Sequence, residues 1–388
     1  MMPRPPDKTL SLPPLSLYIH IPWCVRKCPY CDFNSHEASN NLPEEAYIER
    51  LKRDLDNEHP HIQARKLNSI FIGGGTPSLF SAKSIGTIID YAAKTISFAD
   101  DIEITLEANP GTVEQQKFRG FYDAGVNRLS IGVQSFQGSH LQTLGRIHTA
   151  DDASKAVLIA QTVGFKNINL DLMHGLPSQT LAEAEKDVRV AIALAPQHIS
   201  WYQLTIEPNT VFYRRPPILP CEDRLTKIQQ RGHHLLAEAG YHQYEVSAFS
   251  RRGSPSKHNL NYWQFGDYLG IGAGAHGKNT DATNQSIWRR QKTRQPHHYL
   301  QHETNMVSKH MAIATEELPV EFMMNALRLV EGVPYTLFVE RTGLPLESTE
   351  KTIRSLIKKG LLIDSPTQLA TTPRGQALLN SVVAEFMA

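Results

Sequence analysis

The chain has 388 residues, of which 40% are hydrophobic and 20% are charged. A chain of this length can bury a sizeable core and can hold one large domain with a small one, or two to three ordinary domains. The 40 basic and 39 acidic residues leave a net charge of +1, so the charge balance gives no reason to expect a nucleic-acid or membrane-surface partner.

Residues 1–14, MMPRPPDKTLSLPP, are expected to form an N-terminal tail. They have no long apolar run and no small-residue cleavage site, so they do not resemble a secretory signal. No run of about 18 apolar residues occurs, so no stable membrane insertion is expected. Four cysteines are too few for a secreted disulfide framework, which favours a reducing, cytoplasmic location.

Residues 15–245 are expected to form an α/β barrel domain, because short apolar runs alternate with stretches of helical period. Six successive βα units favour a partial (β/α)6 barrel over a Rossmann sheet, although an open sheet gives the same alternation. The predicted strands are 15–21, 68–72, 102–108, 128–133, 167–173 and 198–206. The predicted helices lie near 43–58, 83–97, 113–124, 150–163, 180–194 and 222–239.

The pattern loosens after residue 240, and residues 246–316 are expected to form an extension of the barrel and a connector. Residues 241–250 predict one more strand. Residues 258–277 are rich in aromatic residues and glycine and predict loops around a short strand. Residues 279–316 are polar and predict an irregular connector.

Residues 317–388 are expected to form a small winged-helix-like domain. Such domains often bind DNA, but the sequence has no dense basic stripe, so a packing or docking role is expected and no nucleic-acid partner. The predicted elements are helices at 319–331, 334–342 and 346–359, a hairpin at 361–372 and a last helix at 373–386.

Cys24, Cys28 and Cys31 directly follow the first predicted strand. Their spacing, C-x3-C-x2-C, wraps a short loop around one centre. An iron–sulfur cluster normally takes four cysteines, so three would leave one iron free to bind another ligand. The sequence alone therefore allows an iron–sulfur cluster with an open iron.

A structural zinc site is the alternative, and it needs a fourth ligand to close its tetrahedron. His20 and His36 are close enough in sequence to supply one. Cys221 lies far away in PPILPCED and is more simply interpreted as a loop thiol.

The segment GGGTPS at 73–78 follows the second predicted strand. It fits neither of the common phosphate-binding glycine motifs. Three glycines let backbone N–H and C=O groups approach a ligand closely, and a tight βα turn is the alternative explanation.

The cysteine spacing, with Tyr30 just before Cys31, resembles the radical S-adenosylmethionine (radical SAM) enzymes. The resemblance implies that Cys24, Cys28 and Cys31 hold a [4Fe–4S] cluster. The amino and carboxylate groups of SAM would chelate the open iron.

Glu107, Gln134, Arg146 and Asp171 lie at or just past predicted strand ends, which form the catalytic face of a barrel. Their flanking motifs resemble the coproporphyrinogen-oxidase branch of the superfamily. The SAM-binding residues that this resemblance implies are Tyr18, Tyr30, Gly74, Gly75, Thr76, Glu107, Gln134, Arg146 and Asp171.

The resemblance covers nearly the whole chain and includes two kinds of protein, the oxygen-independent coproporphyrinogen III oxidases and the HemW-type haem chaperones. The oxidases carry a further cysteine two residues after the third, where this chain has Phe33. They also have a longer N-terminal extension, whereas only about 23 residues precede Cys24 here. Both departures favour the chaperones.

The segment HNLNYW at 258–263 matches the H-N-x-x-Y-W motif of the chaperones. A histidine can ligate haem iron and flat aromatic rings can pack on a porphyrin, although a histidine among aromatic residues is more often structural. The candidate haem-binding residues are His258, Tyr262, Trp263 and, with lower weight, His276.

The resemblance implies a haem chaperone with haem as cargo and apo-haemoproteins, respiratory ones above all, as recipients. It leaves open a homodimer, SAM cleavage and transient membrane association through a recipient. The alternative is an oxygen-independent coproporphyrinogen III dehydrogenase that forms protoporphyrinogen IX by radical SAM oxidative decarboxylation. A zinc-dependent winged-helix regulator is a weaker third hypothesis.

Overall fold

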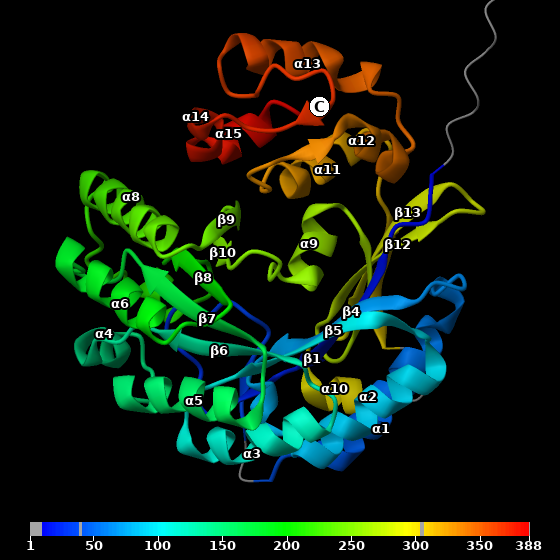
Figure 1. The fold of residues 1–388 in the computed structure, drawn as a ribbon. Coiled ribbons are helices and arrows are strands. Elements are labelled where there is room, and N and C mark those ends of the chain that lie inside the picture. Colours follow the sequence, from blue (N-terminus) through cyan, green and yellow to red (C-terminus); the bar gives the residue numbers. More distant parts are fainter. Residues whose placement is uncertain (1–9, 39–40, 303–305, 388) are drawn as a thin grey trace, which may run out of the picture.

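The computed structural model describes residues 10–38, 41–302 and 306–387. In this part of the chain, a 12-stranded sheet has the strand order β14-β13-β12-β11-β1-β4-β5-β6-β7-β8-β10-β9. Its two ends, β14 and β9, do not pair with each other, so the barrel is partial. Helices cover the outer face of the sheet, and the C-terminal helices lie on its opposite side (Figure 1).

Six parallel strands form the centre of the sheet, as predicted, and each pairs with the next in chain order. Strand β1 is buried on both faces, which is typical of parallel strands covered by helices. The six strands are β1 (Leu15–Ile21), β4 (Leu67–Gly74), β5 (Phe98–Ala108), β6 (Arg128–Gln134), β7 (Asn167–His174) and β8 (His198–Gln203).

The connecting helices also follow the prediction. Thr149 and Thr180 begin two of them with capping boxes, and Gly164 ends the first of these in the left-handed region, at φ 118°. The main helices are α1 (Glu44–Glu58), α2 (Ala82–Thr95), α3 (Thr112–Asp123), α5 (Ala150–Val163), α6 (Leu181–Ala193) and α8 (Glu222–Glu238). Shorter elements are β2 (Trp23–Cys24), β3 (His36–Glu37), η1 (His59–His61), η2 (Pro77–Leu79), α4 (Gly138–Thr143) and α7 (Val211–Arg214).

The prediction of an irregular connector at 279–316 is wrong. The segment extends the sheet through antiparallel strands, because the charged side chains that hide its strand pattern are buried in ion pairs. Lys292, for example, contacts Asp54 and Glu58 of α1. The elements are β11 (Asp267–Ile271), which pairs in parallel with β1, then β12 (His276–Asp281), β13 (Ser286–Lys292), α10 (Pro296–Gln301) and β14 (Val307–Ala312).

The prediction of loops around 258–277 is also wrong at its start, where α9 (Lys257–Trp263) forms a helix. Ser256 caps it, because its hydroxyl oxygen accepts a hydrogen bond from the backbone N–H of Asn259. A helix of 7 residues is too short to show a clear helical period. The single strand predicted at 241–250 is a pair of strands, β9 (His242–Glu245) and β10 (Ala248–Ser250).

The C-terminal helices surround a core that includes Phe322, Phe338 and Leu356. The same core also takes in residues that precede the C-terminal part, such as Phe265 and Ile287. The last predicted helix is divided in two at Leu378, where the backbone leaves the helical conformation. The elements are α11 (Leu318–Ala326), β15 (Val333–Pro334), α12 (Tyr335–Thr342), α13 (Glu347–Lys358), β16 (Gln368–Leu369), α14 (Pro373–Ala377) and α15 (Leu379–Ala384).

Helix α9 lies between the sheet and these C-terminal helices (Figure 1). Arg328 connects the two parts, because it pairs with Glu245 of β9 at 3.1 Å and lies 4.3 Å from the ring centre of Trp263 in α9. The N–H of Val330 also donates to the carbonyl oxygen of Tyr244 at 3.0 Å. The C-terminal part therefore contacts both α9 and the edge strand β9.

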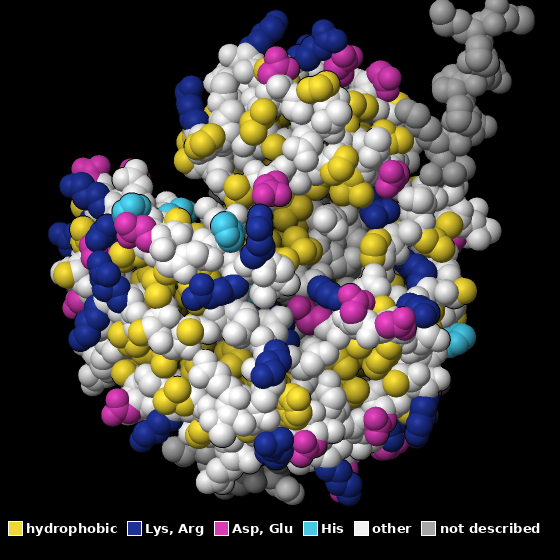
Figure 2. Space-filling view, viewed as in Figure 1, with side chains coloured by type: hydrophobic (Ala, Val, Ile, Leu, Met, Phe, Trp, Pro, Cys, Tyr) yellow, Lys and Arg dark blue, Asp and Glu magenta, His cyan; other side chains and the backbone are white. Residues whose placement is uncertain are grey.

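Basic and acidic side chains are interspersed on the face that Figure 2 shows. This distribution agrees with the small net charge. Among the described residues, no helix is long and apolar enough to cross a bilayer.

Candidate functional site

The loop that carries the cysteines leaves β1 at the carboxyl end of the sheet. Short parallel pairing of β2 with β3 closes this loop, with Trp23 opposite His36 and Cys24 opposite Glu37. Within the loop, the N–H of Cys31 donates to the carbonyl oxygen of Cys28 at 3.1 Å. The three cysteines are half-buried and free of disulfides.

The glycine-rich turn after β4 lies directly against this loop. The N–H of Gly75 donates to the carbonyl oxygen of Ile21, and that of Thr76 to Trp23, both at 2.7 Å. A Cβ atom at Gly75 would lie 2.5 Å from the carbonyl oxygen of Trp23, so only glycine fits there. Gly74 has φ 112°, and its N–H donates to the carboxylate of Glu107 at 3.0 Å.

The three cysteines line one cavity of about 280 Å³, here called the cysteine cavity. Every SAM-binding residue that the resemblance implied, except Tyr18, lines the same cavity. These residues are Tyr30, Gly74, Gly75, Thr76, Glu107, Gln134, Arg146 and Asp171.

The geometry does not support closure of a zinc site by His20. In the described residues, no three His, Cys, Asp or Glu side chains converge on a position for one metal ion. Both ring nitrogens of His20 are engaged, one with the hydroxyl of Tyr18 and one with the carbonyl oxygen of Asn34, each at 2.9 Å. Burial lowers the pKa of His20 to about 4. Cys221 is exposed at the start of α8 and does not line the cavity.

Two buried carboxyl groups define the electrostatics of the cysteine cavity. Burial, followed by the nearby carboxylate of Asp171, raises the pKa of Glu107 to about 8. Burial also raises the pKa of Asp171, whose hydrogen-bond donors are the neutral groups of Ser130 and Asn169, both at 2.9 Å. A cationic ligand in this cavity would stabilise both carboxylates, so the cavity suits a ligand with an ammonium or sulfonium group.

Arg146 and Gln134 are held in place by the strand end of β6. Arg146 donates to the side-chain oxygen of Asn109 and the carbonyl oxygen of Gly132, both at 2.7 Å, and lies 3.7 Å from the sulfur of Cys28. Gln134 has φ 70° where the register of β6 and β7 shifts, as expected of a bulge that turns a side chain into a site. Tyr202 donates to the side-chain oxygen of Gln134 at 2.7 Å.

Asn109, Ser130 and Tyr202 also line the cysteine cavity but were missed in the sequence. All three lie on, or directly after, one of the parallel strands β5, β6 and β8. For Asn109 and Tyr202, the position near a carboxyl strand end is the signal that could have found them, whereas Ser130 lies in the first half of β6 and gives no such signal.

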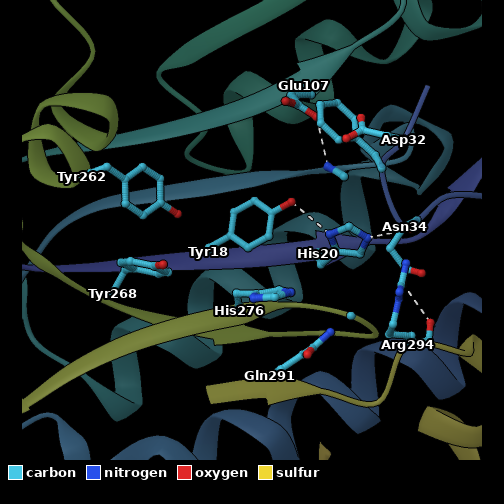
Figure 3. A pocket seen from close by; sticks show the side chains of 13 residues that line it. Tyr18, His20, Asp32, Asn34, Glu107, Tyr262, Tyr268, His276, Gln291 and Arg294 are labelled. Atoms are coloured by element: carbon cyan, nitrogen blue, oxygen red, sulfur yellow. Dashed lines mark hydrogen bonds between the residues drawn. The ribbon is translucent and has the colours of Figure 1, made fainter. Parts of the chain in front are cut away.

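A second cavity of about 480 Å³, here called the tyrosine cavity, adjoins the first and shares Phe33, Gly74 and Glu107 with it. Side chains from β1, α9, β11, β12 and β13 point into it (Figure 3). The remaining lining residues are Tyr18, His20, Asp32, Asn34, Tyr262, Tyr268, Gly274, His276, Gln291 and Arg294.

Only two of the four candidate haem-binding residues line a cavity. Tyr262 and His276 line the tyrosine cavity (Figure 3). His258 is only 2% exposed and lines neither cavity, because it stacks on Phe71 and packs edge-on against Tyr262. Trp263 packs under Arg328 of the C-terminal part.

Burial lowers the pKa of His258 to about 3, so its imidazole is neutral. One ring nitrogen lies 3.1 Å from the hydroxyl of Ser69, and the other, Nε2, is buried without a hydrogen bond. The contacts therefore describe a core histidine that would have to be uncovered before it could bind iron.

Comparison with known proteins assigns both parts of the chain. Residues 18–191 match the radical SAM superfamily, and residues 313–378 match the HemN C-terminal domain. The heme chaperone HemW of Haemophilus influenzae is 52% identical over 97% of this chain and 99% of its own. The heme chaperone HemW of Escherichia coli is 49% identical over 98% of this chain and 100% of its own.

The fold is shared with a solved structure, coproporphyrinogen III oxidase (HemN) of Escherichia coli. The TM-score is 0.81 over 97% of this chain and 91% of that one, at 22% sequence identity. At this low identity the similarity shows a shared fold and no more. The two chaperones, in contrast, match at 52% and 49% identity along nearly their full length. The chain thus belongs to the HemW family of heme chaperones within the radical SAM superfamily.

Proposed function

We propose that the protein is a haem chaperone that binds haem and transfers it to apo-haemoproteins. The observation that carries this proposal is the full-length identity of 52% and 49% to two heme chaperones HemW. We propose respiratory haemoproteins as the recipients. We also propose a cytoplasmic location, because free cysteines persist in a reducing environment.

The radical SAM family implies a [4Fe–4S] cluster and SAM, and the cysteine cavity fits both. Cys24, Cys28 and Cys31 would hold the cluster, which supplies an electron-transfer centre with an open iron position. Burial raises the pKa of Cys24 and Cys31, so these thiols release protons when they ligate iron.

SAM would lie on the glycine turn, with its cationic groups toward Glu107 and Asp171. Gly74, Gly75 and Thr76 line the cavity at this turn. Gln134 and Arg146 line the cavity as well, and Arg146 is fixed by its bond to the carbonyl oxygen of Gly132. Gly75 packs closely on the backbone of Trp23, which fixes the position of the glycine turn. These residues bind and orient, and the intact set is compatible with SAM cleavage.

We place the haem cargo in the tyrosine cavity, with His276 as the iron ligand. The side chain of His276 is accessible to solvent on one side, and the partial burial of its ring together with Arg289 lowers its pKa, so its neutral imidazole can coordinate a metal. Tyr262 and Tyr268 pack edge to face at 4.5 Å on one side, and Arg294 on the other side can pair with a propionate. A volume of about 480 Å³ is in the range of cofactor sites.

Phe33 favours the chaperone function over that of a coproporphyrinogen III dehydrogenase. It lines both cavities and is 63% exposed, so an apolar ring stands where the oxidases have a further cysteine. A phenyl ring can neither donate a proton nor ligate iron, so we expect no oxidative decarboxylation of coproporphyrinogen.

The test is a haemin titration of the anaerobically reconstituted protein, read from the Soret band. We expect one haem per chain for the wild type, a weakened or shifted band for His276→Ala, and a normal band for His258→Phe, which keeps the ring stack on Phe71. Loss of the band in His258→Phe with retention in His276→Ala would overturn the ligand assignment.

The same preparation is then incubated with coproporphyrinogen III, SAM and a reductant. We expect no protoporphyrinogen IX. Its formation, or failure of the wild type to bind haemin, would overturn the chaperone proposal in favour of the enzyme.

A further inference from the structure

Helix α9 lines the tyrosine cavity through Tyr262, and its N-terminal end also forms hydrogen bonds with the hydroxyl group of Tyr244. The N–H of Ser256, the cap of α9, donates to this hydroxyl oxygen at 3.4 Å. A side-chain hydrogen bond from Asn259, the second residue of the HNLNYW segment, acts on the same hydroxyl. Two donors on its oxygen leave the hydroxyl proton of Tyr244 free to point elsewhere.

That proton points at His198 of β8. Its Nε2 atom lies 2.9 Å from the hydroxyl of Tyr244, and its Nδ1 atom lies 2.6 Å from the side-chain oxygen of Asn169. The oxygen of an amide only accepts, so Nδ1 carries the proton and Nε2 accepts from Tyr244. Burial lowers the pKa of His198 well below its usual value, which keeps the ring neutral in this tautomer.

Asn169 extends this series of hydrogen bonds to Asp171, which lines the cysteine cavity. The N–H of Ser200 fixes its orientation by donating to its side-chain oxygen at 3.1 Å. Its amide nitrogen then donates to Asp171 at 2.9 Å and to the hydroxyl of Ser130 at 2.7 Å, and Ser130 donates to Asp171 at 2.9 Å. Every bond from α9 to Asp171 therefore runs in one donor direction.

We propose that Tyr244, His198 and Asn169 form a relay that couples α9 to Asp171, so that the position of α9 sets the affinity of the cysteine cavity for SAM. His198 and Tyr244 are positioning residues, because neither lines a cavity. The relay also gives Asn259 of the HNLNYW segment a role that does not depend on contact with haem.

The coupling has a second consequence, which rests on the proposed function. The same helix carries Tyr262 into the tyrosine cavity, so a cargo that displaces α9 there acts on the relay at its first bond. Coupling between two sites is reciprocal, so haem should change the affinity for SAM by the same factor by which SAM changes the affinity for haem.

Tyr244→Phe tests the relay because it removes one hydroxyl group from a residue that lines neither cavity. We expect SAM to bind about three- to tenfold more weakly to the cluster-loaded protein, the effect of one lost buried hydrogen bond. Tyr241→Phe is the matched control, because the Tyr241 hydroxyl is also buried and donates to the carbonyl oxygen of Pro196 at 2.7 Å, outside the relay. Equal SAM affinity in Tyr244→Phe and the wild type, or equal losses in the two variants, would overturn the proposal.

A double mutant separates a relay from two independent structural effects. His198→Phe should weaken SAM binding, and adding Tyr244→Phe should weaken it no further, because both changes break the same chain. Additive losses would contradict the relay. Circular dichroism and iron content of each variant would show that the fold and the cluster are retained.

Haemin added to the wild type should change the SAM dissociation constant, and this change should disappear in Tyr244→Phe. If the wild type binds no haemin, the proposed function fails while the SAM measurements still decide the relay. If haemin binds but leaves the SAM dissociation constant unchanged, the coupling to the cargo is wrong and the chaperone function stands.

Discussion

Glu107 is one of the three residues that line both cavities, and burial affects its pKa more than charge pairing does. Its carboxylate accepts a hydrogen bond from Gly74, and Asp171 adds a second negative charge nearby. The sequence predicted the residues around it well, because carboxyl strand ends of a parallel barrel converge on one site. It could not predict that His258 lies behind Tyr262, because that burial depends on how α9 packs on β4.

Glu107 gives a pH dependence that can be measured. An acid whose pKa rises from 4.5 to about 8 on folding keeps a proton that the unfolded chain has released, so stability falls as pH rises through that window. Buried histidines such as His20 and His258, whose pKa values are lowered, act in the opposite direction below pH 6.5, so the effect of Glu107 is a difference between two proteins. We expect the free energy of unfolding of the SAM-free wild type, minus that of Glu107→Gln, to decrease between pH 5 and pH 8, with both measured by denaturant titration at each pH. An identical pH slope in the two proteins would contradict this assignment.

At the scale of elements, the central sheet was predictable and its extension was not. The six βα units follow alternating apolar and amphipathic segments, and threonine caps mark α5 and α6. Strands β12 and β13 carry Lys278 and Lys292 in buried ion pairs with Asp267 and with Asp54 and Glu58. Asp54 and Glu58 come from the distant helix α1, and Asp267 comes from the preceding strand β11, so the pattern within each strand could not show that these lysines are buried.

The contact between the cysteine loop and the glycine turn gives a prediction about cluster binding. Gly75→Ala would drive a methyl group into the backbone of Trp23 and displace the loop that carries the cysteines. We expect a several-fold lower iron and sulfide content after reconstitution and a weaker absorbance of the cluster in the visible spectrum.

Gly138→Ala is the control for this change, because a Cβ atom there has open space within 4 Å. It should load the cluster like the wild type. Normal cluster content in Gly75→Ala would show that the turn does not hold the loop in place.

At the scale of the whole molecule, the cysteine cavity lies between the cysteine loop and the central strands, and the adjoining tyrosine cavity lies between β1, α9 and the β11–β13 extension. The cysteine cavity suits a cluster and a cationic cofactor, and the tyrosine cavity suits a planar ligand with an imidazole beside it. The C-terminal part contacts α9 and β9 through Arg328 and Val330, so it can respond to changes in α9. Through the proposed relay, this arrangement connects the two cavities and the C-terminal part by one short helix.

Haem transfer tests the central claim most directly. The protein would be loaded with one equivalent of haemin, separated from free haemin, and mixed with membranes that contain an apo-form of a b-type respiratory enzyme. We predict that the Soret band leaves the protein and that the enzyme gains activity, faster than with the same concentration of free haemin and not with His276→Ala. Failure of the wild type to take up haemin, or retention of the haem without any gain of activity, would contradict the account.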